Sequence, residues 1–297
     1  MIFFGKYTRL FIFALLMLGL HIRAFGQSDT SPQTNKDHAT NADSSLSIHS
    51  LYAGVGSGSN MIFLGSTISH DHPFYTTALT YGYKNCFYAS VSASHITEVN
   101  PFVAFYTLSL NYNHVFNSWF DISSSVSGYK TPSSLREILF SDFAFINLTT
   151  GFDWKLIYTK VSFGDLISDQ NRGYIQIRNS RYFETPEFFK GKGQISFDPY
   201  INTLFGELVK ITTITGVTKF GSSPPFRHFK KNPNSTTESF SYKFGLMDFE
   251  FSLPVTFSYG NFSIEAEPSY IFPAYKNTDY SAPEGFTFFM NINFKIF

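Results

Sequence analysis

Apolar and polar side chains alternate along most of the chain, from Leu51 to the carboxyl terminus. The segment 285–297 shows the pattern most clearly, because Phe, Met or Ile occupies every second position from Phe286 to Ile296, with mostly polar residues between them. A period of two is typical of a β-strand with one apolar and one polar face. The pattern predicts strands at 51–66, 73–83, 86–96, 102–115, 119–130, 140–153, 156–167, 193–206, 208–219, 241–258, 261–274 and 285–297.

The connections between these segments alternate in length. Tight turns are expected at 84–85, 116–118, 154–155, around Glu207 and at 259–260, and longer polar loops at 70–72, 97–101, 131–137, 168–192, 221–240 and 276–284. Short turns that alternate with long loops are typical of up-and-down transmembrane barrels. We therefore predict an all-β fold, a single antiparallel up-and-down transmembrane β-barrel of about 12 strands, with about 10 or 14 as open alternatives.

The first 48 residues do not share the alternation. Residues 1–26 have the features of a signal peptide, namely basic residues before an apolar run and a cleavage site expected near Gly26. The apolar run from Leu10 to Leu20 is too short to span a bilayer. Residues 27–48 are mostly small and polar, so we expect a disordered periplasmic leader. The barrel then occupies residues 49–297.

Each predicted strand offers one parity to lipid and the other to the lumen. In 102–115, for example, Leu108 is expected to face lipid and Ser109 the lumen. Segment 241–258 changes parity near Leu246-Met247. This change predicts a β-bulge, because an unbroken register would place acidic side chains in lipid.

Composition supports a membrane barrel and excludes other classes. The chain has 37 Phe and 18 Tyr, and only 15% of its residues are charged. Aromatic residues favour strands and form the girdles at membrane interfaces. A mean hydropathy of -0.06 is too low for a helical membrane protein. A formal net charge of +0 gives no basic surface for nucleic acid, and the single Cys86 cannot form an internal disulfide.

A terminal strand that ends in Phe297, behind a secretion signal, resembles the C-terminal assembly signal of bacterial outer-membrane β-barrel proteins. Phe297 departs from the pattern in sharing the parity of Lys295. The resemblance implies a porin-like protein of the Gram-negative cell envelope, in contact with outer-membrane lipid and lipopolysaccharide. It also implies recognition of the last strand by the barrel-assembly machinery. A soluble lipocalin-like barrel or β-sandwich remains the alternative, since alternation does not distinguish inside from outside.

Charged residues gather on the inward parity of the later strands. They are expected either to form a network that fills a narrow lumen or to line a cation-preferring pore, and both interpretations stay open. Lys295 is expected beside Glu265. The inward charges are Asp198, Asp248, Glu250, Glu265, Glu267, Lys160, Lys210 and Lys295.

Two predicted outer loops, 168–192 and 221–240, are rich in basic and aromatic residues. Basic side chains there would neutralise lipopolysaccharide phosphates, or would bind an anionic ligand or a partner. The candidates for such binding are Arg172, Arg178, Arg181, Arg227, Lys230 and Lys231.

Three glycines, Gly54, Gly56 and Gly58, share the inward parity of the first strand. They indicate either easier curvature or a seat for the leader or for a loop folded into the lumen. The loop 70–72 holds two His residues, which is too few ligands for a metal site.

His95 and Thr97 stand two apart, as do the His and Ser of outer-membrane phospholipases, but the stretch that follows in that family is missing. We therefore expect no catalytic residues, no metal and no cofactor. The sequence predicts a non-enzymatic narrow channel for small solutes. A structural or ligand-binding barrel with a filled lumen is the alternative, and a lipid-modifying enzyme is a remote one.

Overall fold

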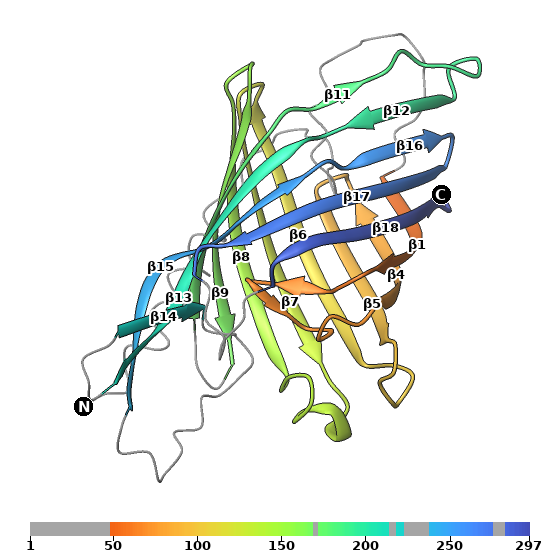
Figure 1. The fold of residues 1–297 in the computed structure, drawn as a ribbon. Coiled ribbons are helices and arrows are strands. Elements are labelled where there is room, and N and C mark those ends of the chain that lie inside the picture. Colours follow the sequence, from red (N-terminus) through yellow and green to blue (C-terminus); the bar gives the residue numbers. More distant parts are fainter. Residues whose placement is uncertain (1–47, 169–171, 214–217, 223–237, 276–282) are drawn as a thin grey trace, which may run out of the picture.

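Backbone hydrogen bonds join twelve strand positions into a closed ring (Figure 1). The computed structural model describes residues 48–168, 172–213, 218–222, 238–275 and 283–297, with the backbone alone at 209–213, 218–222 and 238–240. Strand β18 pairs antiparallel with β17 on one side and with β1 on the other, which closes the sheet. The predicted all-β, antiparallel up-and-down barrel is confirmed.

Most positions in the ring hold one unbroken strand. These strands are β1 His49–Gly58, β4 Phe74–Tyr83, β5 Phe87–Ile96, β6 Phe105–Asn117, β7 Phe120–Lys130, β8 Phe143–Asp153, β9 Tyr158–Ile167, β17 Phe262–Pro273 and β18 Gly285–Lys295. The other positions hold strands that are broken once: β10 Arg172–Ser180 with β11 Phe183–Glu184, β12 Gly193–Phe197 with β13 Tyr200–Thr213, and β15 Glu238–Ser252 with β16 Val255–Tyr259. A short β14, Thr218–Ser222, extends the sheet beside β13.

One end of the barrel, which we call the turn end, carries tight connections and both ends of the wall. Leu51 N donates to Phe297 O at 3.1 Å, so the first and last strands meet there. Lys84 and Asn85 both have positive φ, 51° and 52°, as a two-residue turn between strands requires. The tight turns predicted at 84–85, 116–118, 154–155 and 259–260 are confirmed within a residue or two. The opposite end, with the longer connections, is the loop end.

The wall between residues 168 and 213 differs from the prediction. Segment 168–192 is not an outer loop, because β10 runs through it towards the turn end and the connection to β12 lies there. No turn occurs at Glu207, which lies inside β13. β12 and β13 form one position in the wall, interrupted at Pro199, because proline has no N–H to donate to the ladder.

The predicted β-bulge in β15 is confirmed. Leu204 of β13 pairs with Asp248 of β15, and the next residue, Phe205, pairs with Leu246. Met247 is therefore the extra residue on β15. Met247 is 1% exposed and Asp248 is 7% exposed. The bulge therefore keeps the acidic residues of β15 on the inner face, as the change in parity required.

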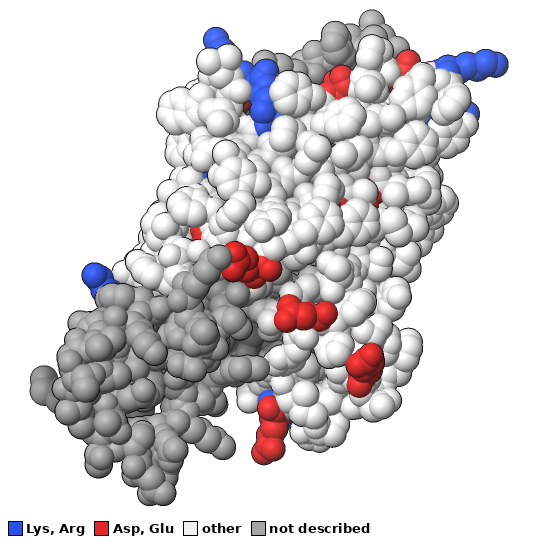
Figure 2. Space-filling view, in the orientation of Figure 1, with Lys and Arg blue, Asp and Glu red and all other residues white. Residues whose placement is uncertain are grey.

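The outer face of the wall is apolar and the inner face is polar. Leu108 in β6 is 61% exposed, while Ser109 beside it makes a hydrogen bond of 2.9 Å with Ser127 of β7 inside the barrel. On the face shown in Figure 2, Lys, Arg, Asp and Glu gather towards the two ends and are nearly absent from the band between them. This is the reverse of a soluble barrel, in which the apolar parity points inward.

Helical structure is limited to one short element in the described part of the chain, η1 at Ser133–Leu135 in the connection after β7. Within the same residues, no helix has the length and apolar character needed to cross a membrane.

Replacing Leu108 by Lys tests which face meets lipid. Because the side chain lies in the outer band, the free energy of unfolding from lipid vesicles should fall by about 2–4 kcal/mol. Leu156, 84% exposed in the turn after β8, is the matched control, and Leu156→Lys should cost roughly 0–1 kcal/mol. Equal costs for the two variants in denaturant titrations would contradict the assigned outer face.

Candidate functional site

The first connection at the loop end, residues 59–73, folds into the lumen. Its tip is a small hairpin, β2 Ile62–Phe63 and β3 Ser66–Thr67. The ring of Phe63 lies 5.5 Å from Tyr129 and 5.3 Å from Phe145, which are side chains of β7 and β8. On the far side, a Cβ built on Gly65 would be 3.0 Å from Asp248 Oδ2. The hairpin therefore reaches across the lumen from one wall to the other.

Local chemistry explains why the segment forms a hairpin. Leu64 and Gly65 have φ values of 50° and 72°, which a two-residue turn requires and which Gly adopts without strain. Asn60 holds the base of the hairpin, because its Oδ1 accepts hydrogen bonds from Thr67 at 2.6 Å and Ser69 at 2.9 Å. Ile68 N donates to Met61 O at 2.7 Å and closes the loop.

A compact apolar core fills the loop end around this hairpin. Part of it comes from the connection 131–142, which adds Leu135, Leu139 and Phe140. The buried members of the core are Ile68, Phe74, Ile96, Ala104, Phe105, Leu135, Leu139, Phe140, Phe143, Leu166, Tyr174, Leu204, Leu208 and Met247. Burial of these apolar side chains stabilises the packing of the hairpin at the loop end.

The rest of the inner surface is polar but differs from wall to wall. On β4 to β9, cross-strand hydroxyl pairs such as Thr149 with Ser162, at 2.8 Å, cover the inner face. On β15 and β17 the inner face carries carboxylates, and Tyr200 and Asn202 of the neighbouring β13 contact them. Tyr200 donates to Glu267 at 2.6 Å and lies 3.1 Å from Glu250, which also accepts from Asn202 Nδ2 at 3.2 Å.

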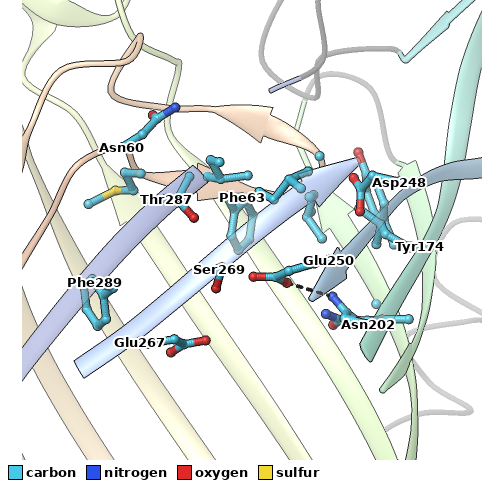
Figure 3. A pocket seen from close by; sticks show the side chains of 18 of the residues that line it. Asn60, Phe63, Tyr174, Asn202, Asp248, Glu250, Glu267, Ser269, Thr287 and Phe289 are labelled. Carbon is cyan, nitrogen blue, oxygen red and sulfur yellow. Dashed lines mark hydrogen bonds between the residues drawn. The ribbon is translucent and has the colours of Figure 1, made fainter. Parts of the chain in front are cut away.

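A cavity of about 510 Å³ lies between the hairpin and this acidic wall (Figure 3). Its acidic groups are Asp248, Glu250 and Glu267, and the described residues that line it include no Lys, Arg or His. Figure 3 shows Phe63 entering from the hairpin and Glu250 with Asn202 from the wall. The cavity thus combines carboxylates with aromatic rings in one lining.

Five of the sequence-predicted lumen charges lie on the inner wall with partners or within the cavity. Asp198 is 6% exposed and accepts from Arg178 at 3.0 Å. Glu265 accepts from Thr256 at 3.2 Å, while Asp248, Glu250 and Glu267 line the cavity.

The predicted cations lie as follows. Lys160 Nζ lies 5.3 Å from the ring centre of Tyr158. Lys295 is not beside Glu265, because Asn291 lies opposite Glu265 in the ladder, and the pairing predicted from the distance to the last turn is wrong. The side chain of Lys210 lies outside the described residues.

The basic residues assigned to outer loops are placed differently. Arg172 is at the loop end of β10, 4% exposed, with Nε 3.2 Å from Glu207 Oε2. Arg178 is inside the barrel, 3.7 Å from the centre of the Tyr200 ring. Arg181 lies after β10 and donates to the carbonyl of Lys155 in a turn. Arg172 and Arg178 belong to the wall, and Arg181 lies at the turn end, because β10 replaces the expected loop. Arg227, Lys230 and Lys231 lie outside the described residues.

The three glycines of β1 make room for neighbouring strands. A Cβ on Gly54 or Gly56 would be 2.5 Å from Asn293 Oδ1 or 2.6 Å from Asn291 Oδ1, and one on Gly58 would meet the ring of Phe74. The sequence had left open a loop folded into the lumen, and such a loop is present. It consists of residues 59–73. The strand predicted at 51–66 was therefore too long, because β1 ends at Gly58 and residues 59–66 belong to this loop.

The two His motifs have structural partners. His95 Nδ1 lies 2.6 Å from Phe102 O, and Thr97 Oγ1 donates to Pro73 O at 3.0 Å, so the two side chains do not pair with each other. His70 Nε2 lies 3.1 Å from Ile138 O and ties the first loop to the connection 131–142. Within the described ranges, no three His, Cys, Asp or Glu side chains converge as a metal site.

Sequence reasoning missed Tyr200, Asn202 and Phe63 as lumen residues. Tyr200 and Asn202 alternate with Ile201 on β13, so their parity was a usable signal once the strand was recognised. Phe63 gave no such signal, because its contacts depend on a loop that turns inward.

No family model matches the chain, and no curated protein does. Among solved structures, the NanC porin is 9% identical with a TM-score of 0.42, over 83% of this chain and 100% of that one. The β-domain of the Bordetella autotransporter BrkA is 11% identical with a TM-score of 0.35, over 84% and 100%. OccAB3 from Acinetobacter baumannii is 11% identical with a TM-score of 0.35, over 85% and 65%.

These likenesses are too remote to indicate an activity, whereas the closed ring, apolar outer band and polar interior are properties of this chain itself. The chain is an outer-membrane-type β-barrel. For such a barrel the tight turns are periplasmic and the longer connections face outward. The hairpin and its apolar core lie at the loop end, which is the outward end in barrels of this type.

Arg178→Ala tests the buried ion pair in the barrel interior. It would leave the Asp198 carboxylate, with 8% of its side chain exposed, without its partner, so the free energy of unfolding should fall by about 3–5 kcal/mol. The control is Arg136→Ala, which breaks an exposed 2.8 Å pair with Asp142 and should cost roughly 0–1 kcal/mol. If the two variants unfold at the same denaturant concentration, the pair does not stabilise the lumen.

Proposed function

We propose that this protein is a narrow, non-enzymatic channel of the bacterial outer membrane, closed at its outer end by its own first loop and selective for small cations. The observation that carries the proposal is the cavity beside the hairpin, whose described lining includes Asp248, Glu250 and Glu267 but no basic residue. Rings of carboxylates favour cations in channels. Motion of the hairpin would join this cavity to the outside.

The proposal includes a route to the membrane. The signal peptide is removed near Gly26, and the barrel-assembly machinery engages the last strand, β18. Apolar side chains on the outer parity of that strand, such as Phe286 with 67% exposure, support this assignment. Lipid surrounds the outer band, and lipopolysaccharide meets the loop end.

A second candidate is a barrel with a permanently filled lumen that binds a ligand or partner. The apolar core at the loop end favours it, because the core residues Ile96 and Ala104 are each 0% exposed and Phe140 is 1% exposed. Moving a core of this kind costs free energy in proportion to the apolar area exposed. The two candidates differ in whether the hairpin leaves its site.

Excision of the hairpin separates these candidates. Residues 62–67 are replaced by Gly-Gly. The two glycines then connect Met61 to Ile68, which already share a 2.7 Å backbone hydrogen bond. In planar bilayers the native protein should show rare, small openings, and the excised variant frequent openings of several-fold higher conductance. Glu250→Gln with Glu267→Gln should reduce cation preference in the excised variant, because both carboxylates line the cavity.

Heat-modifiable migration in electrophoresis would show that each variant is folded. The Glu137→Gln control removes an exposed carboxylate from the connection 131–142 and should leave ion preference unchanged. A folded but silent excised variant would overturn the channel and favour the filled barrel. Wide, steady openings of the native protein would show that the hairpin is not the closure.

A further inference from the structure

We propose that the cavity between the hairpin and the acidic wall is a binding site for a small organic ammonium compound with an apolar body. This inference rests on the proposed channel, because it names the class of solute that the channel would hold. It depends on four features of the cavity: carboxylates without a cation among the described lining residues, an amide oxygen without a donor, aromatic rings in the lining and a matching volume.

The carboxylates form the first feature. The single hydroxyl of Tyr200 reaches both Glu267, at 2.6 Å, and Glu250, at 3.1 Å, so the two acids are near neighbours. Asp248 adds a third carboxylate to the lining and has no ion pair within the described residues. Like charges this close destabilise one another unless a proton or a cation joins them. A bound cation would offset that repulsion.

Arg178 does not supply the missing charge. Its guanidinium lies over the ring of Tyr200 and is paired with Asp198 at 3.0 Å. It is not part of the cavity lining, whereas Glu250 and Glu267 are. Since no described basic residue lines the cavity, a bound cation or protonation would supply the positive charge there.

Asn202 supplies the second and independent feature. The residue is 5% exposed and lines the cavity. Its Nδ2 donates to Glu250 at 3.2 Å, but its Oδ1 accepts no hydrogen bond from the described residues. A buried acceptor without a donor costs free energy, so most buried polar atoms have partners. An ammonium N–H bound between Asn202 and the carboxylates would satisfy it.

The remaining features define the kind of cation. Within the described residues the acids do not converge as a metal site. The space between them suits a cation larger than a metal ion. Phe63 of the hairpin and Phe145 of β8 line the cavity away from the acidic strands, and Phe289 lies beside Glu267 in the ladder. Aromatic faces attract both apolar groups and ammonium ions. A cavity of about 510 Å³ lies within the usual range for small-molecule sites.

Calorimetric titration of the protein, purified from membranes in detergent, tests the site directly. The probes are 2-phenylethylamine, the neutral 2-phenylethanol and the anionic phenylacetate, which share a phenyl body and differ in charge. We expect the amine to bind roughly tenfold or more tightly than either of the others, because hydrogen bonds to charged groups are the strong ones. Equal binding of all three, or binding of none, would overturn the site.

Variants show whether the named groups hold the amine. Asp248→Asn and Glu250→Gln should each weaken amine binding by roughly tenfold and leave 2-phenylethanol unaffected. Glu137→Gln is the matched control, since it removes one carboxylate at the exposed loop end. Should a cavity variant fail to fold, the native protein's preference for the amine still decides the question.

Conductance and binding can fail separately. A folded barrel that stays silent after hairpin excision but binds the amine selectively would overturn the channel and keep the site. A barrel that conducts after excision but shows no preference for the amine would overturn the site and keep the channel.

Discussion

Closure of the hydrogen-bond ladder between β18 and its two neighbours is the constraint on which the rest of the structure depends. In lipid, every backbone N–H and C=O must find a partner within the protein, so an open sheet edge is not permitted. The pairing of β18 with both β17 and β1 removes that edge. In a closed barrel, the outer face of the wall must be apolar, and the lumen must be filled by side chains or by water.

The interior has two parts, because the hairpin and the connection 131–142 enter it from the loop end only. At the loop end, the hairpin tip around Phe63 and the side chain of Phe140 build an apolar core. In the rest of the interior, polar side chains have partners on neighbouring strands: hydroxyls pair with hydroxyls, and Arg178 pairs with Asp198. The cavity lies where these two kinds of filling meet, so aromatic rings and carboxylates both line it. Solute selection and closure would therefore depend on the same few side chains.

Local patterns predicted the barrel well and its interior less well. Alternation, the turn at Lys84-Asn85 and the bulge at Met247 are properties of short segments, and the structure has each of them. The segment around Pro199 misled the prediction, because a broken ladder and the inward Arg178 resemble a loop in sequence. The hairpin could not be predicted, since the contacts of Phe63 are with strands far along the chain.

The position of the first loop inside the barrel is tested most directly by nuclear Overhauser effects in the micelle-embedded protein with selectively labelled aromatic rings. The structure predicts cross-peaks from Phe63 to Tyr129 and Phe145, whose ring centres lie 5.5 and 5.3 Å away. It also predicts that Phe63 shifts differ from those of a solvent-exposed ring. Absence of these cross-peaks, together with random-coil shifts for Phe63, would contradict a lumen closed by its own loop.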